Sequence, residues 1–460
     1  MEPRPSREEL QKLSKDELID IIYSLYDIIE KHSKQIAELQ AIISNKKNSK
    51  NSSKPPSTDL TYPSRKKNKK GKYGPSKGHK GISRKISEKP DFIMNIPVEK
   101  CPRTGQTIKS HSKSYKIHQI LELTTPKFNV IEIRRQITTG PDGKTVIAPN
   151  PAGVKDYQRF GNNFKMYVCY LRYRLNVPWK RIISFLEEIA KDKISVGALQ
   201  NIFEELKTEL TDESEEIKEK IRKSESVGID ETSIKVNGDR HWLSVFRTQK
   251  ETYFGFSPNR SHALPQEILG TDYKGIIISD FYGVYTDKYF PKAKEFQKCL
   301  AHVLRDIQYA LELKNGNSDY AKKLMDVVLD AVYLKKYFTF ATPDYLEQRQ
   351  EIESRLNELV FNVKTELPKE ANRLRKRFKK CRTDVFTFLY HENIPFDNNG
   401  SERDIRELVI CRKISGAYKT TQGLGRLTVI KSVISTALKN HNNVSKIFKN
   451  AFNPVVLEYG

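Results

Sequence analysis

The sequence predicts a multidomain α+β protein, on three observations along its 460 residues. An apolar seam with alternating spacings of three and four indicates one long amphipathic helix near the start. Residues 45–90 are rich in Lys, Ser, Asn, Pro and Gly, and they separate that helix from the rest. From residue 226 the apolar period changes from helical to alternating, which predicts a sheet followed by further helices.

The chain is strongly basic, with 81 Lys and Arg against 57 Asp and Glu and a formal net charge of +24. A protein this basic usually meets a polyanion, and nucleic acid is a better candidate than an anionic membrane surface. The sequence has no apolar run of the length that crosses a membrane, and its start lacks the apolar core of a signal peptide. Five widely spaced cysteines fit a reducing compartment better than a disulfide framework. We therefore expect a cytoplasmic protein with no membrane partner.

Residues 1–44 form the first expected unit, an N-terminal coiled coil. Its seam consists of Leu18, Ile22, Leu25, Ile29, His32, Ile36, Leu39 and Ile43, of which only His32 is polar. Such a seam predicts a homodimer or higher multimer through residues 18–43. The alternative is a helix that packs on the body of its own chain.

Residues 45–90 form a basic linker that we expect to be disordered, because it has too few apolar side chains to offset its chain entropy. Its excess of Lys and Arg suits loose binding to DNA phosphates, and a solvated spacer is the alternative. The expected DNA contacts in this segment are Lys66, Lys67, Lys69 and Lys70.

The sequence of the next unit, residues 91–155, predicts a small β-rich module. Strands are expected at 115–123 and 129–133, with a turn at 141–144.

Residues 156–222 return to helical periodicity. One apolar stripe runs from Phe164 to Leu175, and a later helix begins with Ser195 as its cap. Short helices with tight turns suit either a helix-turn-helix that binds DNA or helical packing without DNA contact.

The region from residue 223 predicts a mixed α/β domain. The expected elements are strands at 226–236, 240–248 and 251–256, a helix at 262–269, strands at 274–280 and 295–299, and a helix at 300–313. This is the element order of a ribonuclease-H-like sheet. We expect the core to comprise residues 223–314 and 393–451, with a charged helical insertion at 315–392 and a C-terminal tail at 452–460.

Three carboxylates lie at the edges of apolar or turn-rich segments: Asp230, Asp280 and Glu402. Asp230 lies on the first strand, Asp280 ends the fourth, and Glu402 starts the helix after the insertion. Carboxylates that converge repel one another, and divalent cations relieve the repulsion. Hard oxygen ligands suit Mg²⁺ or Mn²⁺, and two such ions would clamp a phosphodiester. Glu231 competes with Asp230, because adjacent strand residues point to opposite faces and only one can join the site.

Each carboxylate alone also has an ordinary explanation. An aspartate at a strand edge is typical of turns and caps, and Glu402 suits the first turn of any helix. Catalysis with metal ions therefore depends on the three residues occurring together.

Further sequence blocks surround these carboxylates. They are residues 51–59, 77–81, 228–232, 241–243, 279–280, 299–302, 397–403 and 412–416. The most specific is Asp397-Asn398-Asn399-Gly400-Ser401-Glu402-Arg403. In these blocks the chain resembles the large transposase of insertion-sequence family 66, a bacterial DDE transposase.

The resemblance implies a ribonuclease-H-like catalytic domain in which Asp230, Asp280 and Glu402 bind Mg²⁺ or Mn²⁺. It implies a bacterial, nucleoid-associated enzyme that nicks the ends of a DNA element and joins the 3′-hydroxyls to target DNA. Its partners would be double-stranded DNA and further copies of itself, and a need for accessory transposition proteins stays open. The alternatives are a catalytically inactive DNA-binding descendant of a transposase and a structure-specific nuclease of the same fold.

Family members similar to this chain often carry paired Cys-x-x-Cys knuckles after the linker. Here Cys101 is followed by Thr104 in place of the second cysteine, and residues 140–143 replace the partner knuckle. One thiolate cannot complete a four-ligand zinc site, so zinc is not expected there.

His302 follows Cys299 by three residues, on one helical face. A zinc site would need two more ligands, and His391 is the only nearby candidate in the sequence. His302 otherwise supports the active site, near the scissile phosphate or Asp280, or is a structural histidine.

Basic residues follow Glu402. Arg403 and Arg406 suit either the DNA backbone beside the metals or pairing with Asp404 and Glu407. The other expected DNA contacts are Arg412, Lys413 and Lys419.

A glycine-containing segment at 415–425, which includes Tyr418 and Lys419, is expected to be a loop between two helices. It either contacts DNA or simply connects the helices. Trp242 is expected in the core rather than as a wedge between bases.

Overall fold

The computed structural model describes residues 14–44, 88–89, 93, 105–107, 134–139, 141, 145–148, 150, 154, 158–190, 194–313 and 318–452. Contacts divide the chain into two compact units, residues 1–62, 133–184 and 194–460 in one and residues 63–132 and 185–193 in the other. Several predictions lie outside the described residues: the linker contacts Lys66, Lys67, Lys69 and Lys70, the strands at 115–123 and 129–133, and the pair Cys101 and Thr104.

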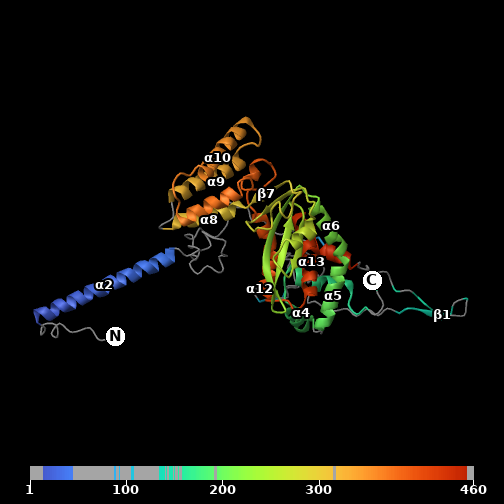
Figure 1. The fold of residues 1–460 in the computed structure, drawn as a ribbon. Coiled ribbons are helices and arrows are strands. Elements are labelled where there is room, and N and C mark those ends of the chain that lie inside the picture. Colours follow the sequence, from blue (N-terminus) through green and yellow to red (C-terminus); the bar gives the residue numbers. More distant parts are fainter. Residues whose placement is uncertain are drawn as a thin grey trace. The chain divides into compact units, whose positions relative to one another are not determined.

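A single long helix, α2 (Lys15–Ser44), contains the predicted heptad seam (Figure 1). Ser14 and Glu17 cap its start: the Ser14 amide donates to the Glu17 carboxylate at 2.7 Å, and the Glu17 amide donates to the Ser14 hydroxyl at 3.3 Å. Ile22, Leu25 and Ile29 are 50–60% exposed. The helix is confirmed, and self-association through it stays a prediction.

The described part of the β-rich module is a two-stranded antiparallel sheet. β1 (Ile137–Thr139) pairs with β2 (Thr145–Ile147) on either side of the expected turn at 141–144.

The region before the large sheet is helical, as predicted. Its elements are α3 (Asn162–Cys169), the π-helix η2 (Tyr170–Arg174), α4 (Trp179–Phe185), the π-helix η3 (Leu186–Ala190), α5 (Val196–Glu209) and α6 (Thr211–Arg222). Ser195 caps α5, because its hydroxyl accepts from the Ala198 amide at 3.1 Å. The predicted apolar stripe from Phe164 to Leu175 is wrong at its last residue, because Leu175 follows the end of η2 and is 53% exposed.

The large sheet has five strands in the order β5-β4-β3-β6-β7. Its strands are β3 (Ser226–Val236), β4 (Asp239–Arg247), β5 (Thr252–Ser257), β6 (Ile276–Ser279) and β7 (Glu295–Lys298). β3, β4 and β5 are antiparallel neighbours, whereas β6 runs parallel to both β3 and β7. α7 (Ala263–Leu269) separates β5 from β6, so the predicted strand-strand-strand-helix-strand order is confirmed.

Helices follow the sheet. They are α8 (Leu300–Glu312), α9 (Ser318–Tyr337), α10 (Pro343–Phe361), α11 (Lys369–Lys380), the 3₁₀-helix η4 (Thr387–Leu389), α12 (Asn399–Ser415), α13 (Thr421–Lys439) and α14 (Val444–Ala451). Residues 415–425 are not all loop, because α13 already begins at Thr421. Figure 1 shows α12 and α13 beside the sheet, and α8, α9 and α10 in a group of their own.

Two apolar cores hold these layers together. One joins Ile276 and Ile278 of β6 to the helices from α8 to α11, and the other joins β3, β4 and β5 to α12 and α13. At the sheet's edge, amides of β5 donate to α13: Thr252 to the Thr436 hydroxyl at 2.9 Å and Phe254 to the Ser432 hydroxyl at 2.8 Å. The helix thereby covers hydrogen-bonding groups that an edge strand would otherwise leave unpaired.

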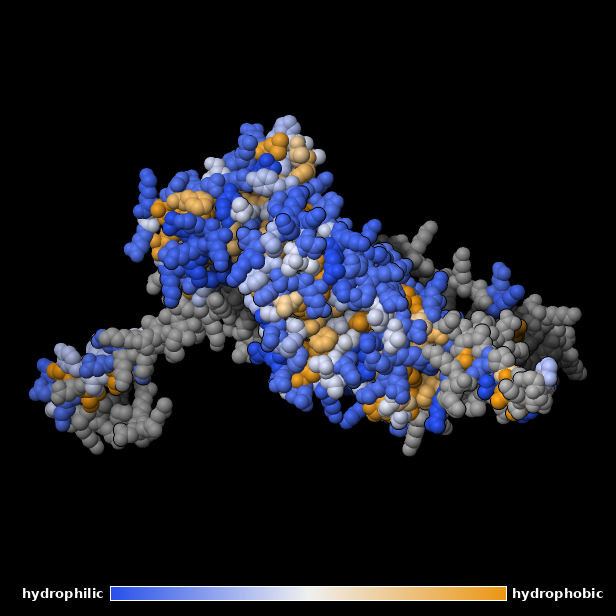
Figure 2. Space-filling model, turned by 45° about the vertical axis from the view of Figure 1, so that its right-hand side comes forward, coloured by the Kyte–Doolittle hydropathy of each residue, from blue (hydrophilic) through white to orange (hydrophobic). Residues whose placement is uncertain are grey.

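None of the described helices combines the length and the apolar character that a membrane span requires. The four cysteines placed by the structure, Cys169, Cys299, Cys381 and Cys411, are free thiols. Most of the surface coloured in Figure 2 is hydrophilic.

Candidate active site

The sheet brings Asp230 and Asp280 to neighbouring strands. β3 and β6 are parallel, and their pairing ends with Gly228 opposite Ile278. Continuing this register by two residues places Asp230 level with Asp280, which directly follows the last residue of β6.

α12 begins directly against β3. The Asn398 side-chain amide donates to the Ile229 carbonyl at 2.7 Å, and the Ser401 hydroxyl donates to Oδ1 of Asn398 at 2.6 Å. Gly228 permits this close approach, because a Cβ there would lie 2.5 Å from Oγ of Ser401. Glu402, in the first turn of α12, is therefore carried to the strand that bears Asp230.

The three carboxylates influence one another electrostatically. Burial is the largest cause that raises the pKa of Asp230, and the charges of Glu231, Asp280 and Glu402 raise it further, to about 7. A hydrogen bond from the Glu231 amide at 2.9 Å opposes this rise only in part. The charges of Asp280 and Glu402 thus reach Asp230 from separate segments of the chain, although among the described residues the three carboxylates do not form a group whose ligand atoms all lie within 4.8 Å of one another.

Two of these three carboxylates face a cation. Oδ2 of Asp280 lies 3.7 Å from Nη2 of Arg260, and Oε1 of Glu402 lies 3.5 Å from Nη2 of Arg305. Asp230 forms no ion pair with any side chain described in residues 194–313 and 318–452. Asp230 is therefore the most poorly compensated negative charge of the three.

Glu231 also lies at the site, contrary to the expectation that only one of the adjacent acids could join it. Its carboxylate is only 6% exposed, accepts a hydrogen bond from the Tyr285 hydroxyl and pairs with Arg260 at 3.0 Å. Burial raises the pKa of Glu231, whereas the Tyr285 and Arg260 contacts lower it. Arg260 links Glu231 to Asp280, so both neighbours in β3 border the cluster, with Glu231 already engaged by two donors.

Sequence reasoning missed Arg260. Its guanidinium carbon lies 5.0 Å from the centroid of the Trp242 ring and 3.9 Å from that of Tyr282. The prediction that Trp242 is a core residue is therefore wrong. Trp242 is half-buried, and the Arg260 guanidinium stacks on its ring. Arg260 sits in the loop between β5 and α7, where no periodic pattern marks a residue. The only available signals were the aromatic residues near two of the predicted motifs.

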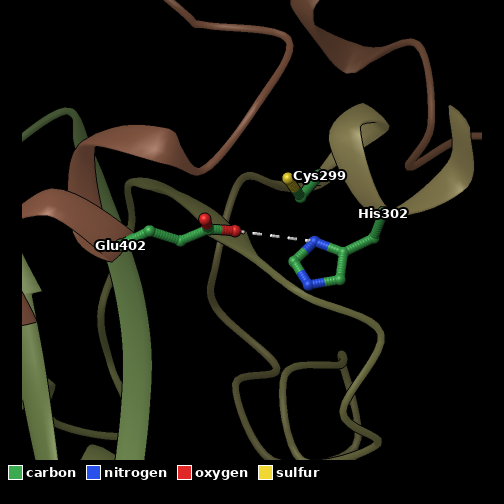
Figure 3. Close-up of side chains that lie close together, drawn as sticks. All are labelled: Cys299, His302 and Glu402. Atoms are coloured by element: carbon green, nitrogen blue, oxygen red, sulfur yellow. Dashed lines mark ion pairs between the residues drawn. The ribbon is translucent and has the colours of Figure 1, made fainter. Parts of the chain in front are cut away.

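Cys299, His302 and Glu402 form a second cluster, drawn in Figure 3. One potential ligand atom from each lies within 4.8 Å of the others, and His302 Nδ1 is 4.0 Å from Oε1 of Glu402. Among the described groups, His302 Nδ1 is buried without a hydrogen-bond partner. His391, the ligand suggested by the sequence, instead contacts Glu295 at 3.0 Å. The nearest acidic partner of His302 is thus Glu402, not a second histidine.

The sequence profile of the transposase IS66 family matches residues 158–426. The match covers more than half of the chain and includes Asp230, Asp280 and Glu402. The chain belongs to the IS66 transposase family. The family acts on DNA, so this chain is a DNA transposase by family. Residues 2–85 match a family of unknown function, DUF6444, and a search of curated proteins gave no match.

One alternative for this IS66 transposase was that Arg403 and Arg406 pair with Asp404 and Glu407. In the described structure these two acids pair with other residues. Asp404 contacts Arg247 at 3.0 Å and Lys439 at 2.7 Å, and Glu407 contacts Lys431 at 3.2 Å. Arg403 and Arg406 are exposed on α12, as are Lys413 beyond them and Lys419 in the loop.

Arg412 and Tyr418 are instead tied to β3 of the transposase. Arg412 donates to the Thr232 hydroxyl at 3.0 Å and to the Ser233 carbonyl. The Tyr418 amide donates to the Lys235 carbonyl at 2.9 Å, which fastens the short loop after α12 to the strand. These contacts fasten α12 and the loop that follows it to β3.

Proposed function

We propose that this transposase nicks the ends of a DNA element and joins the resulting 3′-hydroxyls to target DNA by phosphoryl transfer with two divalent ions. Asp230, Asp280 and Glu402 are the proposed ligands, and Mg²⁺ or Mn²⁺ are the proposed ions. The core that carries them is proposed to be ribonuclease-H-like, comprising residues 223–314 and 393–451 with the helical insertion 315–392.

The observation that carries this proposal is geometric: the strand register sets Asp230 level with Asp280, and the Asn398 hydrogen bond to Ile229 brings the start of α12, with Glu402, to the same strand. The charges of Asp280 and Glu402, which add to the raised pKa of Asp230, support it. Strand order supports the fold: three antiparallel strands, then two parallel strands reached through a helix.

The donor set fits a divalent ion. Carboxylate oxygens are the ligands that Mg²⁺ and Mn²⁺ prefer, and Asp230 in particular gains a missing positive partner. The Cys299 thiol offers soft sulfur beside Glu402, but burial raises its pKa to about 11, so it is a thiol rather than a thiolate near pH 7. The hard-ligand set is therefore the better match.

Each residue has a distinct task in the proposed mechanism. Asp230 and Asp280 would hold the divalent ions from adjacent strands, and Glu402 would hold them from α12. Bound there, the ions would supply the activation of water or a 3′-hydroxyl and the stabilisation of the leaving oxygen. Arg305 would keep Glu402 near the site through their ion pair. The His302 ring lies beside Glu402, and burial lowers the pKa of His302, which favours the neutral ring.

DNA contacts are proposed on the exposed cations. Arg403, Arg406, Lys413 and Lys419 would hold the backbone near the site, and the lysines at 66–70 would add loose phosphate contacts from the linker. Multimers are proposed through residues 18–43, since Ile22, Leu25 and Ile29 expose apolar surface in the single chain.

Cleavage of a DNA fragment that carries the element's end tests the proposal. Asp280→Asn should abolish Mg²⁺-dependent nicking and joining, because it removes a ligand charge. Asp330→Asn is the matched control, since Asp330 pairs with Arg355 on the helical insertion. Equal cleavage by Asp280→Asn would refute the ligand assignment. Binding without nicking in the unaltered protein would select an inactive DNA-binding protein, and cutting of branched DNA without joining would select a nuclease.

A further inference from the structure

Arg260 is held more closely by Glu231 than by Asp280. Its Nη2 and Nε lie 3.0 and 3.3 Å from Oε2 of Glu231, whereas Nη2 lies 3.7 Å from Oδ2 of Asp280. The guanidinium also packs on the rings of Trp242 and Tyr282, and the Tyr282 hydroxyl donates to the Arg260 carbonyl at 2.6 Å. Arg260 would therefore stay in position through Glu231 and the two aromatic rings if its contact with Asp280 were broken.

The two carboxylates differ in what else they bind. Glu231 is 6% exposed, and the Tyr285 hydroxyl holds its other oxygen. Asp280 is 29% exposed, and the Tyr282 amide donates to its Oδ1 at 2.8 Å. Glu231 is thus the buried anchor of Arg260, whereas the Asp280 side chain is more exposed and its Oδ2 has the longer contact to the guanidinium.

We propose that Arg260 is a positioning residue that holds Asp280 before a divalent ion binds and then exchanges Asp280 for a DNA phosphate. The inference rests on the proposed function. An arginine at this distance competes with a cation for the same oxygen, and two positive charges beside one carboxylate repel each other. A phosphate is the anion that DNA brings to the site, and it matches the donor fork of a guanidinium.

Binding of Mn²⁺ to the full-length protein without DNA, followed by electron paramagnetic resonance, tests the first half. Arg260→Gln should tighten Mn²⁺ binding about threefold or more, because the competing cation is gone. Arg260→Lys keeps the charge and should bind nearly as the unaltered protein does. Arg355→Gln, which removes an ion pair on the helical insertion, should change nothing. Unchanged or weaker binding in Arg260→Gln would overturn the inference, since loss of a merely structural contact does not tighten a metal site.

Binding of an element-end duplex over a range of salt concentrations tests the second half. With Ca²⁺ present, Arg260→Gln should weaken binding and reduce the slope of log K against log salt by about one. Without divalent ions, when Arg260 still faces Asp280, the slope should match that of the unaltered protein. Equal slopes in Ca²⁺ would overturn the phosphate exchange.

A second variant covers the case in which Arg260→Gln fails to fold. Tyr282→Leu removes the nearer ring and the hydroxyl that holds the Arg260 backbone, but keeps the backbone amide that binds Asp280. It should tighten Mn²⁺ binding in the same direction, and unchanged binding would count against the inference.

Asp280→Asn separates this inference from the proposed function. If it leaves Mn²⁺ binding unchanged, the ligand assignment itself is wrong. If it weakens Mn²⁺ binding while Arg260→Gln does not tighten it, only the role of Arg260 is wrong.

Discussion

The side-chain amide of Asn398 donates a 2.7 Å hydrogen bond to the backbone carbonyl of Ile229, 169 residues earlier in the chain. Both residues are buried. The pairing of β3 with β6 ends at Gly228, so Asn398 takes the place of the neighbouring strand at the next residue. One side chain thus joins the strand that carries Asp230 to the helix that carries Glu402.

Replacing Asn398 by Ala should therefore loosen the site as well as the fold. It leaves the buried Ile229 carbonyl without its donor, which costs about 1–3 kcal/mol of unfolding free energy. Chemical denaturation measures the loss, and Mn²⁺ binding should weaken in the same variant. Asn362→Ala, an exposed position at the end of α10, is the control. Full stability of Asn398→Ala would show that this hydrogen bond does not hold α12 in place.

Gly228→Ala tests the close approach of α12 to β3. The added Cβ would lie 2.5 Å from Oγ of Ser401 and 3.1 Å from Oδ1 of Asn398, so the start of the helix must shift. We expect a loss of about 1–3 kcal/mol and weaker metal binding. Gly283→Ala, where a Cβ meets nothing within 4 Å, should be nearly neutral.

The Gly228→Ala defect should be partly relieved by Ser401→Ala, which removes the atom in closest conflict. Thermal unfolding of the two single variants and the double variant measures the coupling between the positions. Strict additivity of the two losses would mean that the conflict lies elsewhere.

From the raised pKa of Asp230 we predict that the protein without divalent ions loses unfolding free energy as the pH rises. Its pKa is raised from 3.8 to about 7 in the folded protein, chiefly by burial. Between these values the folded state binds more protons than the unfolded state, so the unfolding free energy falls with rising pH and levels off above about pH 7. Asp230→Asn should make this slope shallower, with the raised pKa of Glu231 still contributing, and in EDTA at pH 8 its unfolding free energy should exceed that of the unaltered protein by about 1–3 kcal/mol.

Thermal unfolding in EDTA from pH 4 to 8 measures this effect. Addition of Mg²⁺ at pH 8 should stabilise the unaltered protein but not Asp230→Asn. A variant less stable than the unaltered protein at pH 8 would mean that the Asp230 charge is already compensated.

Because the apolar seam of α2 is exposed in the single chain, we predict that apolar-to-charged substitutions in it dissociate the proposed multimer. Leu25→Asp with Ile29→Asp places charges at two positions that are 50% and 60% exposed in the single chain. Light scattering after size exclusion should show monomers for this variant. Asp27→Asn on the same helix should keep the multimer, and a multimer that survives the double change would place the interface outside residues 18–43.

The strands of the large sheet could be predicted from the sequence because their signals are local, whereas β1 and β2 were not predicted. Alternating apolar residues define β3 to the residue, and its turn at Asn237 and Gly238 has positive φ at both positions, as a tight hairpin requires. The α12 start was also predictable, since the segment 397–403 places turn residues directly before a helical pattern.

The roles of individual side chains were harder to predict, because they depend on contacts between distant segments. Arg412 and Tyr418 look like DNA-binding residues in sequence, yet both are bonded to β3. Arg260 has no periodic pattern around it, and its role depends on the carboxylates and aromatic rings that the fold brings to it.

The most direct test of the shared metal site is a crystal structure of the protein soaked with Mn²⁺, with the ion located by its anomalous scattering. We predict Mn²⁺ bound by carboxylate oxygens of Asp230, Asp280 and Glu402, with the guanidinium of Arg260 moved away from Asp280. Mn²⁺ bound elsewhere, or held by Glu402 with Cys299 and His302 while Asp230 and Asp280 stay free, would contradict it.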